Sequence, residues 1–113
     1  MILQQTSDYI VKEIRINKGC RLSLQYHKEK RETLFLISGD GYIESNQITS
    51  KVDWFYSDGI SVERNFPLYM EPFYVDAGTI HRIGCNNTPA VFLEISTTEL
   101  GDVVRVEDDF NRC

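Results

Sequence analysis

Short runs of alternating apolar and polar residues, separated by turn residues, constrain the fold of this chain more than any other feature of its sequence. In RLSLQYH, residues 21–27, leucines and a tyrosine alternate with polar side chains, which is the period of a β-strand with one buried face. Turn residues such as those of NKG (17–19) and NNTP (86–89) separate such runs. Because stretches with the period of a helix are missing, the sequence predicts an all-β protein.

The expected strands are short, and many of them are joined by glycine-bearing turns. They cover residues 9–16, 21–27, 32–38, 42–45, 53–56, 60–63, 72–77, 80–85, 90–97 and 102–108. The strands at 32–38 and 42–45 are expected to pair as a hairpin, and Gly78-Thr79 is expected to join the strands at 72–77 and 80–85. So many short strands without helices imply a sandwich or small antiparallel barrel of jelly-roll type.

Residues 46–71 form the least regular part of the chain and contain its only tryptophan. Three interpretations of this segment remain open. It could be a lid or specificity loop at the mouth of the barrel, a dimer surface built on Trp54 and Phe55, or a set of aromatic residues that completes the core.

Length and charge restrict the class of protein. A chain of 113 residues is expected to form one domain over residues 1–113. The net charge of −5 argues against a nucleic-acid partner, and the basic segment KEKR (28–31) includes a glutamate and is expected to be a solvated turn. The N-terminus does not resemble a signal peptide, apolar runs of bilayer length are missing, and the three cysteines have no CxxC spacing. These features predict free thiols in a cytoplasmic protein without a membrane partner.

Four residues form a candidate metal site. Gln25 and His27 project from the same side of one expected strand, and Glu32 opens the next apolar run. The only other histidine, His81, lies far downstream in FYVDAGTIHRI. Two imidazoles, a carboxylate and an amide oxygen make a ligand set that suits a divalent transition metal.

Glu94 lies in the middle of the apolar strand AVFLEIST, on the same face as Phe92 and Ser96. An unpaired carboxylate in a hydrophobic core would be costly. Glu94 therefore either faces solvent or lines a polar cavity.

The motifs around these residues resemble those of cupins. Gly19 to Gly39 resembles the first cupin motif, with Gln25 in place of the usual first histidine, and DAGTIH (76–81) resembles the second. More closely, RLSLQYH with Glu32, AGTIHR and the tail LGDVVRVEDDFNR are similar to the cupin domain of type II mannose-6-phosphate isomerases.

This resemblance implies a small cupin barrel that holds one divalent ion (Zn, Mn, Fe or Ni) and pairs as a homodimer. The implied activity interconverts mannose 6-phosphate and fructose 6-phosphate through a metal-stabilised enediolate. Glu94 would then line the cavity as the base. The arginines that could contact the phosphate are Arg105 and Arg112 in the tail, with Arg21 and Arg82 as further candidates.

Three other functions are compatible with the same residues. The chain could be a different metal-dependent cupin enzyme, such as an iron oxygenase or a lyase acting on a small acid. It could be a module that binds a sugar or another small ligand without turnover. It could also be a metal-free sugar-nucleotide epimerase or ketoisomerase, which would not depend on Glu32.

Overall fold

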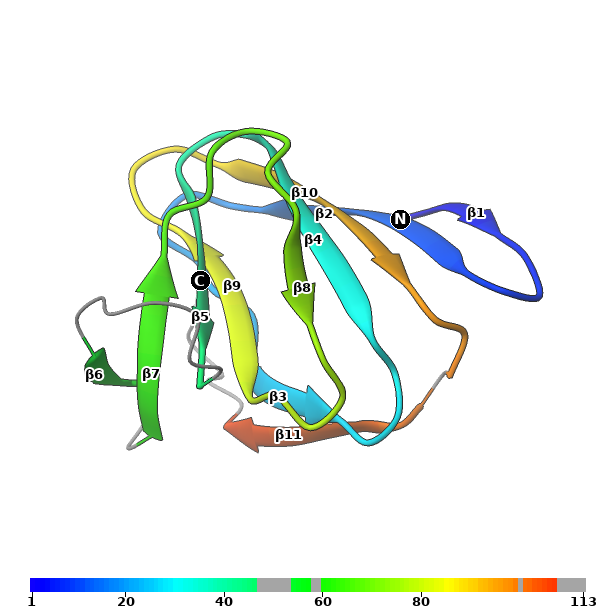
Figure 1. Ribbon diagram of the computed structural model, residues 1–113. Helices are drawn as coiled ribbons and strands as arrows, with labels where there is room; N and C mark the ends of the chain where they lie inside the picture. Colours follow the sequence, from blue (N-terminus) through cyan, green and yellow to red (C-terminus); the bar gives the residue numbers. More distant parts are fainter. Residues whose placement is uncertain (47–53, 58–59, 100, 108–113) are drawn as a thin grey trace.

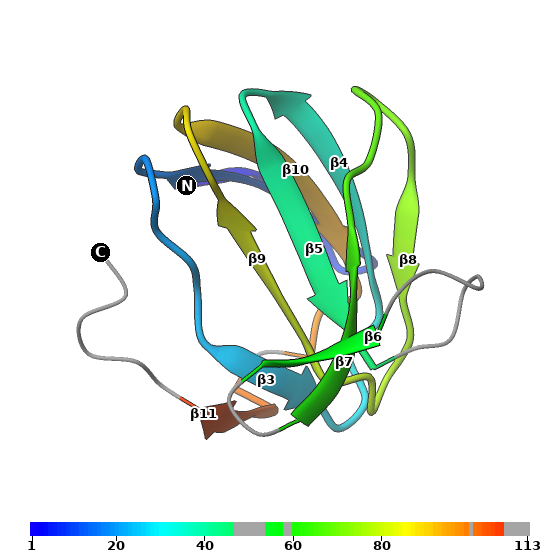
Figure 2. The ribbon, with the colours of Figure 1, turned by 90° about the vertical axis from the view of Figure 1, so that its left-hand side faces the viewer.

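The protein is built from two antiparallel β-sheets that face each other (Figures 1 and 2). A computed structural model describes residues 1–46, 54–57, 60–99 and 101–107, and the regular elements in these ranges are all strands. They are β1 (Ile2–Gln5), β2 (Ile10–Ile16), β3 (Leu24–His27), β4 (Glu32–Ser38), β5 (Gly41–Ser45), β6 (Trp54–Ser57), β7 (Ile60–Asn65), β8 (Phe73–Val75), β9 (His81–Cys85), β10 (Ala90–Ser96) and β11 (Val103–Glu107). The all-β prediction is confirmed.

The order of strands in each sheet differs from the expected hairpin. The five-stranded sheet has the order β1-β2-β10-β4-β8, and the six-stranded sheet has the order β11-β3-β9-β5-β7-β6. Strands β4 and β5 therefore lie in different sheets, so the prediction that they pair as a hairpin is wrong. Strands β8 and β9, which Gly78-Thr79 joins as expected, also lie in different sheets. The glycine turns carry the chain from one sheet to the other. Gly39 has φ +85° there, and a Cβ at this position would lie 1.8 Å from the carbonyl oxygen of Pro89, so only glycine fits.

Two further differences concern the ends of strands. Strand β1 was not expected, because its four residues are all exposed and lack alternation. The strand expected over residues 21–27 begins only at Leu24, and Arg21 forms an isolated bridge to Gly84. The two strands expected within 46–71 are present as β6 and β7, which pair with each other. The side chains of Trp54 and Phe55 lie outside the described part of the structure, and so do residues 47–53.

The space between the sheets has an apolar end and a polar end. At the apolar end, Phe92 and Leu34 pack with Ile43 and Val75, and burying each large side chain contributes about 1.5–3 kcal/mol. At the polar end, one row of aligned residues crosses neighbouring strands of the six-stranded sheet. The row consists of Arg105, Gln25, His81, Ser45 and Glu63. The candidate site residues belong to this polar end.

Two cysteines of the described part differ in state. Cys85 is a buried free thiol whose Sγ donates to the carbonyl oxygen of Asn17 over 2.8 Å. Cys20 is disulfide-bonded, so the expectation that all three cysteines are free thiols is wrong.

Across the ranges that the structure describes, no helix has the length and apolar character needed to cross a membrane.

Candidate metal centre

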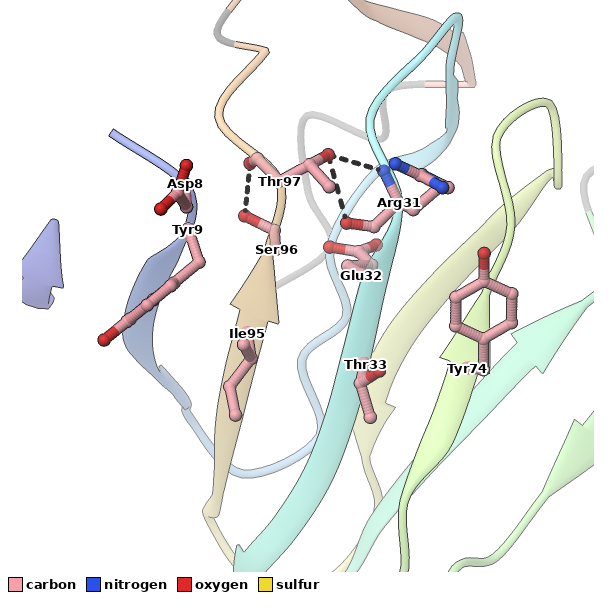
Figure 3. A pocket seen from close by; sticks show the side chains of 9 residues that line it. All are labelled: Asp8, Tyr9, Arg31, Glu32, Thr33, Tyr74, Ile95, Ser96 and Thr97. Carbon is pink, nitrogen blue, oxygen red and sulfur yellow. Dashed lines mark hydrogen bonds between the residues drawn. The ribbon is translucent and has the colours of Figure 1, made fainter. Parts of the chain in front are cut away.

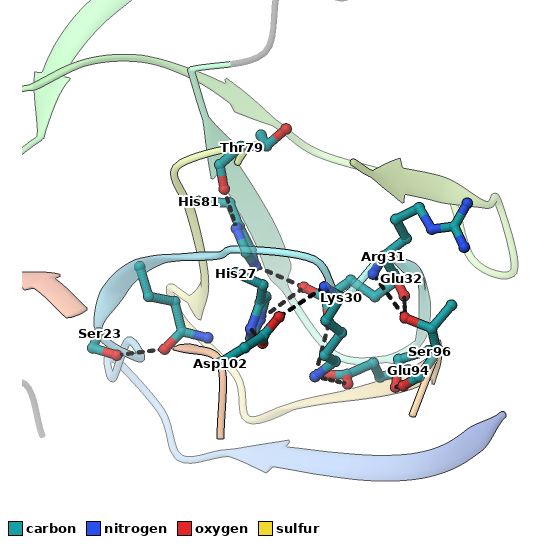
Figure 4. A network of polar contacts seen from close by, with 12 residues as sticks. Ser23, His27, Lys30, Arg31, Glu32, Thr79, His81, Glu94, Ser96 and Asp102 are labelled. Carbon is teal, nitrogen blue, oxygen red and sulfur yellow. Dashed lines mark hydrogen bonds and ion pairs between the residues drawn. The ribbon is translucent and has the colours of Figure 1, made fainter. Parts of the chain in front are cut away.

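His27, Glu32 and His81 converge at the polar end of the barrel (Figure 4). His27 ends β3 and His81 begins β9, which are neighbours in the six-stranded sheet, whereas Glu32 begins β4 in the opposite sheet. Glu32 Oε1 lies 2.7 Å from His81 Nε2 and 3.9 Å from His27 Nε2. One ligand atom from each of the three residues lies within 4.8 Å of the others. The two sheets together thus bring three of the four predicted ligands into one cluster.

The cluster is shielded from water, with exposed side-chain fractions of 7% for His27, 3% for Glu32 and 5% for His81. His81 Nδ1 lies 2.8 Å from the carbonyl oxygen of Thr79. This contact places the proton on Nδ1 and turns Nε2 toward Glu32, as in the histidines of many metal sites. Within the described ranges, neither ring nitrogen of the buried His27 makes a hydrogen bond. Buried polar atoms without partners are costly, so the site fits an additional ligand at this point.

A cavity of about 30 Å³ adjoins the cluster. This volume is large enough for one water molecule. Its lining includes Glu32, His81 and Gln25, which lies opposite His81 in the pairing of β3 with β9. Gln25 Oε1 accepts a hydrogen bond from Ser23 Oγ at 2.9 Å. Imidazole nitrogens with carboxylate and amide oxygens suit a divalent transition metal, and the cavity has room for an ion. The residues present therefore fit such an ion, and Gln25 as its fourth ligand stays a prediction.

The pKa values of the two histidines in the cluster are shifted in opposite directions. Burial of Glu32 opposes its ionisation, but the hydrogen bond and charge of His81, together with the charge of Lys30, lower the pKa of Glu32 to about 2. Burial lowers the pKa of His81, but the hydrogen bond and charge of Glu32 raise it further, so its pKa is shifted upward. Burial lowers the pKa of His27. Without an ion, Glu32 and protonated His81 form a buried ion pair. Metal binding would displace the proton from His81 Nε2, while Nδ1 keeps its proton toward Thr79.

Glu94 lies behind this cluster and is paired with a buried lysine. Glu94 faces inward from β10 and is 7% exposed, so of the two alternatives for this residue the polar cavity is confirmed. Lys30 Nζ lies 3.0 Å from Glu94 Oε1 and 3.8 Å from Glu32 Oε2 (Figure 4). Burial and the charge of Glu32 raise the pKa of Glu94. The prediction that KEKR is a solvated turn holds for its other three residues and is wrong for Lys30, which is 7% exposed.

Asp102 holds the loop between β3 and β4 in place. Its Oδ2 accepts hydrogen bonds from the backbone amides of Glu29 at 2.8 Å and Lys30 at 2.9 Å. Its Oδ1 lies 3.3 Å from His27 Nδ1. Asp102 is thus placed to orient both His27 and the loop that carries Lys30, which is the usual task of a carboxylate behind a metal-binding histidine. Sequence reasoning missed it because Asp102 is far downstream and belongs to no ligand-like spacing.

A larger cavity of about 340 Å³ opens beside the cluster. Its lining residues are Lys12, Ile14, Leu22, Gln25, His27, Lys30, Glu94, Glu99, Gly101, Asp102, Val103 and Arg105. Glu94, the expected base, and Arg105, an expected phosphate contact, therefore share a cavity with the proposed ligands Gln25 and His27. Arg112 lies outside the described residues. Arg82 is fully buried, 3.6 Å from Glu44 Oε1, which engages it away from this cavity.

Comparisons with known proteins identify the fold. No protein-family model matches the sequence, and no curated protein matches it significantly. A conserved protein with a double-stranded β-helix domain from Klebsiella pneumoniae subsp. pneumoniae is 18% identical with a TM-score of 0.67, over 95% of this chain and 82% of that chain. The capsular polysaccharide assembling protein CapF from Staphylococcus aureus is 14% identical with a TM-score of 0.67, over 95% of this chain and 34% of CapF.

An oxalate decarboxylase variant from Bacillus subtilis is 22% identical with a TM-score of 0.64. The match covers 88% of this chain but only 24% of the decarboxylase, so this chain spans a minor part of that enzyme and of CapF. Proteins with this fold thus include enzymes. At identities this low the likeness establishes architecture alone: the chain has the double-stranded β-helix, or cupin, fold.

Proposed function

We propose that residues 1–113 form a single metal-binding cupin domain that interconverts an aldose and a ketose phosphosugar, in the manner of mannose-6-phosphate isomerase. The observation that carries this proposal is the buried cluster of His27, Glu32 and His81 beside a cavity that also holds Glu94. The sequence resemblance to the isomerase cupin supports the choice of substrate.

The chain's residues have complementary tasks in this reaction. A divalent ion, when bound by His27, Glu32, His81 and Gln25, supplies Lewis-acid polarisation of substrate oxygens and offsets the negative charge of an enediolate. Glu94 is the base. It removes the proton from the carbon beside the carbonyl, the C–H electron pair forms the carbon–carbon double bond, and the carbonyl electrons move to oxygen.

Return of the proton to the former carbonyl carbon completes the reaction. The hydroxyl proton passes between the two oxygens, so that aldose becomes ketose without an external oxidant. The raised pKa of Glu94 suits a group that both accepts and donates a proton. Lys30, at 3.0 Å, holds the Glu94 carboxylate in position.

The test is proton exchange rather than net conversion alone. Protein loaded in turn with Zn, Mn, Fe or Ni is incubated in deuterated water with mannose 6-phosphate or fructose 6-phosphate, and nuclear magnetic resonance follows the C1 and C2 protons. We expect deuterium at the carbon next to the carbonyl together with interconversion of the two sugars. A fully metallated protein that exchanges no proton in either sugar would refute the isomerase proposal.

A lyase acting on a small acid is the second candidate, because oxalate decarboxylase is among the proteins of similar fold. Consumption of a dicarboxylate by the metallated protein, with no exchange in the phosphosugars, would favour it. Tight phosphosugar binding with neither reaction would instead point to a non-catalytic binding module.

We also propose that the protein is a homodimer in which a second copy covers the outer face of the five-stranded sheet. Exposed Tyr9, Tyr74 and Ile95 line a pocket of about 260 Å³ on this face (Figure 3). These three side chains form the apolar part of a lining that also includes Asp8, Arg31 and Thr97, and apolar side chains gathered on an exposed face favour an interface. The ion pair between Glu13 and Arg15, at 2.7 Å, balances the charges on the face of β2 that carries these two residues, so two copies can meet there without repulsion.

The dimer prediction is tested by charge insertion. The wild type should have twice the chain mass of 13.1 kDa by light scattering at micromolar concentration. Ile95→Glu should give a folded monomer, because a carboxylate buried in an apolar interface is costly. Leu68→Glu is the control, since Leu68 is 72% exposed on the 46–71 segment. A monomeric wild type contradicts the dimer, and dissociation by Leu68→Glu alone moves the interface to that segment.

A further inference from the structure

Two of the cysteines lie directly opposite each other at the apolar end of the barrel. The segment between β2 and β3 runs beside β9, where Arg21 forms an antiparallel bridge with Gly84 (Figure 2). Cys20 and Cys85 are the next residues along from this bridge, and the amide of Cys85 donates to the carbonyl oxygen of Cys20 over 3.0 Å. The two cysteines are therefore cross-strand neighbours, although Cys20 lies outside the regular strands.

The side chains of these two cysteines also point to the same side. Cys20 and Cys85 are 4% and 2% exposed and belong to the buried apolar cluster around Phe92. Their sulfur atoms contact consecutive carbonyl groups of one turn, Cys85 Sγ at 2.8 Å from the oxygen of Asn17 and Cys20 Sγ at 3.7 Å from that of Lys18. Both sulfur atoms thus lie in one small region of the core.

The two sulfur atoms differ in oxidation state. Cys20 is disulfide-bonded, whereas Cys85 is a free thiol. The chain has three cysteines, so Cys113 is the one left to pair with Cys20 within a chain, and it lies outside the described residues. A disulfide with a free thiol beside it is the set of groups that thiol–disulfide exchange requires.

The backbone spacing allows a bond between Cys20 and Cys85. Directly opposite residues of antiparallel chains have Cα atoms about 4.5–5.5 Å apart, and disulfides join residues whose Cα atoms are about 4.4–6.8 Å apart. The Cβ atoms of such pairs are about 4.5–5.5 Å apart and would have to approach slightly, since a disulfide holds them at about 3.5–4.5 Å. A bond formed under such strain is easily broken again, so the exchange can run in both directions.

We propose that Cys20 and Cys85 form a thiol–disulfide exchange site, which moves the bond of Cys20 from Cys113 to Cys85. Cys85 loses its proton to water, and its thiolate attacks Cys20 Sγ. As the new sulfur–sulfur bond forms, the bond between Cys20 and Cys113 breaks, and its electron pair leaves with the Cys113 sulfur, which takes up a proton. One disulfide and one thiol are present before and after, so no oxidant or reductant is consumed. The exchange requires neither a metal ion nor a sugar, so it stands or fails separately from the isomerase proposal.

The exchange determines whether the end of the chain is tied to the core. Strand β11 is the edge strand of its sheet, has β3 as its one neighbour among the described strands, and places Val103 opposite His27. A bond from Cys20 to Cys113 tethers the chain shortly after β11. Moving the bond to Cys85 releases this tether and leaves β11, beside a proposed metal ligand, with noncovalent contacts alone.

Disulfide mapping of the native protein tests the exchange. Oxidised protein is held at pH 8 without added thiol, then denatured in acid, which stops an exchange that needs the thiolate, and alkylated with N-ethylmaleimide. Digestion without reduction and mass spectrometry locate the label. In the wild type we expect label on both Cys85 and Cys113, whereas Cys85→Ser, which keeps a donor for Asn17, should carry none at Cys113. A wild type labelled at Cys85 alone would overturn the exchange.

Cys113→Ser tests the geometry without the third cysteine. This variant is reduced and then oxidised with glutathione disulfide, and we expect the folded protein to form the Cys20–Cys85 bond. The same protein oxidised in denaturant is the control and should carry mainly mixed disulfides with glutathione, because the two cysteines are far apart in the sequence. A folded protein that keeps free thiols or carries only glutathione adducts would refute the site. Thermal unfolding verifies that both variants are folded.

Amide hydrogen exchange at β11 measures release of the tether. Cys113→Ser with the Cys20–Cys85 bond represents the released state, and oxidised Cys85→Ser represents the tethered state. The amides of β11 should exchange several-fold faster in the released state, while those of β10 exchange equally in both. Equal exchange at β11 in the two proteins would overturn its control by the disulfide.

Discussion

Replacing His81 with alanine should remove bound metal almost completely and destabilise the protein even in the absence of metal. His81 supplies one of two ring nitrogens to the cluster, and its Nε2 lies 2.7 Å from Glu32. Removing it leaves the Glu32 carboxylate buried without its main partner. Breaking a buried ion pair costs roughly 3–5 kcal/mol in unfolding free energy. The loss of metal adds to this deficit, because an ion that binds only the folded state stabilises it.

Metal content by elemental analysis and unfolding with and without a chelator measure both effects. Ser45→Ala is the matched control, since Ser45 is buried, lies opposite His81 on β5, and its hydroxyl makes no hydrogen bond to any residue that the structure describes. This control should keep its metal and its chelator-sensitive transition. A His81→Ala protein that still binds one equivalent of metal would exclude His81 as a ligand.

Replacing Glu94 with glutamine should lower the isomerisation rate on the order of a hundredfold or more while leaving the metal content unchanged. Glutamine keeps the shape of the side chain and can still accept a bond from Lys30, but it cannot take up a proton from the substrate. The loss of a general base has an effect of this size. The KM should change little, because the effect falls on the proton transfer itself.

Exchange of substrate protons with solvent and the steady-state constants measure the Glu94→Gln effect directly. Glu99→Gln is the control, because Glu99 lines the same cavity and is not assigned a role in the reaction. It should retain the rate within a few fold. A Glu94→Gln enzyme with the wild-type exchange rate would remove Glu94 from the mechanism.

The sequence predicted two strands closely where an apolar run is bounded by turn residues or charged residues. The strand expected at 32–38 coincides with β4, and the one expected at 90–97 differs from β10 by one residue. In both strands, the residues next to one another in the sequence are enough to indicate that the segment is a strand with a buried face. The hairpin prediction failed because the glycine turn Gly39–Gly41 specifies a change of direction but not the sheet that the next strand joins. That choice depends on strands far away in the sequence, such as β10 beside β4.

The residues of the candidate site also differ in how far the sequence could predict them. His27, Glu32 and His81 could be singled out because histidines are rare in this chain and their spacing is informative. Lys30 and Asp102 could not, since charged residues are common and are usually exposed. Their burial arises from partners distant in sequence, Glu94 for Lys30 and the loop amides for Asp102.

The three residues of the metal cluster come from both sheets, and this affects how the two sheets can separate. An ion held by His27, Glu32 and His81 would join the two sheets at their polar end, where few apolar side chains pack between them. Escape of the ion and parting of the sheets there would then be one event, with a single rate. Amide hydrogen exchange at the start of β4 and β9 should slow on metal binding to match the dissociation rate of the ion, while amides at the apolar end keep their own slower exchange.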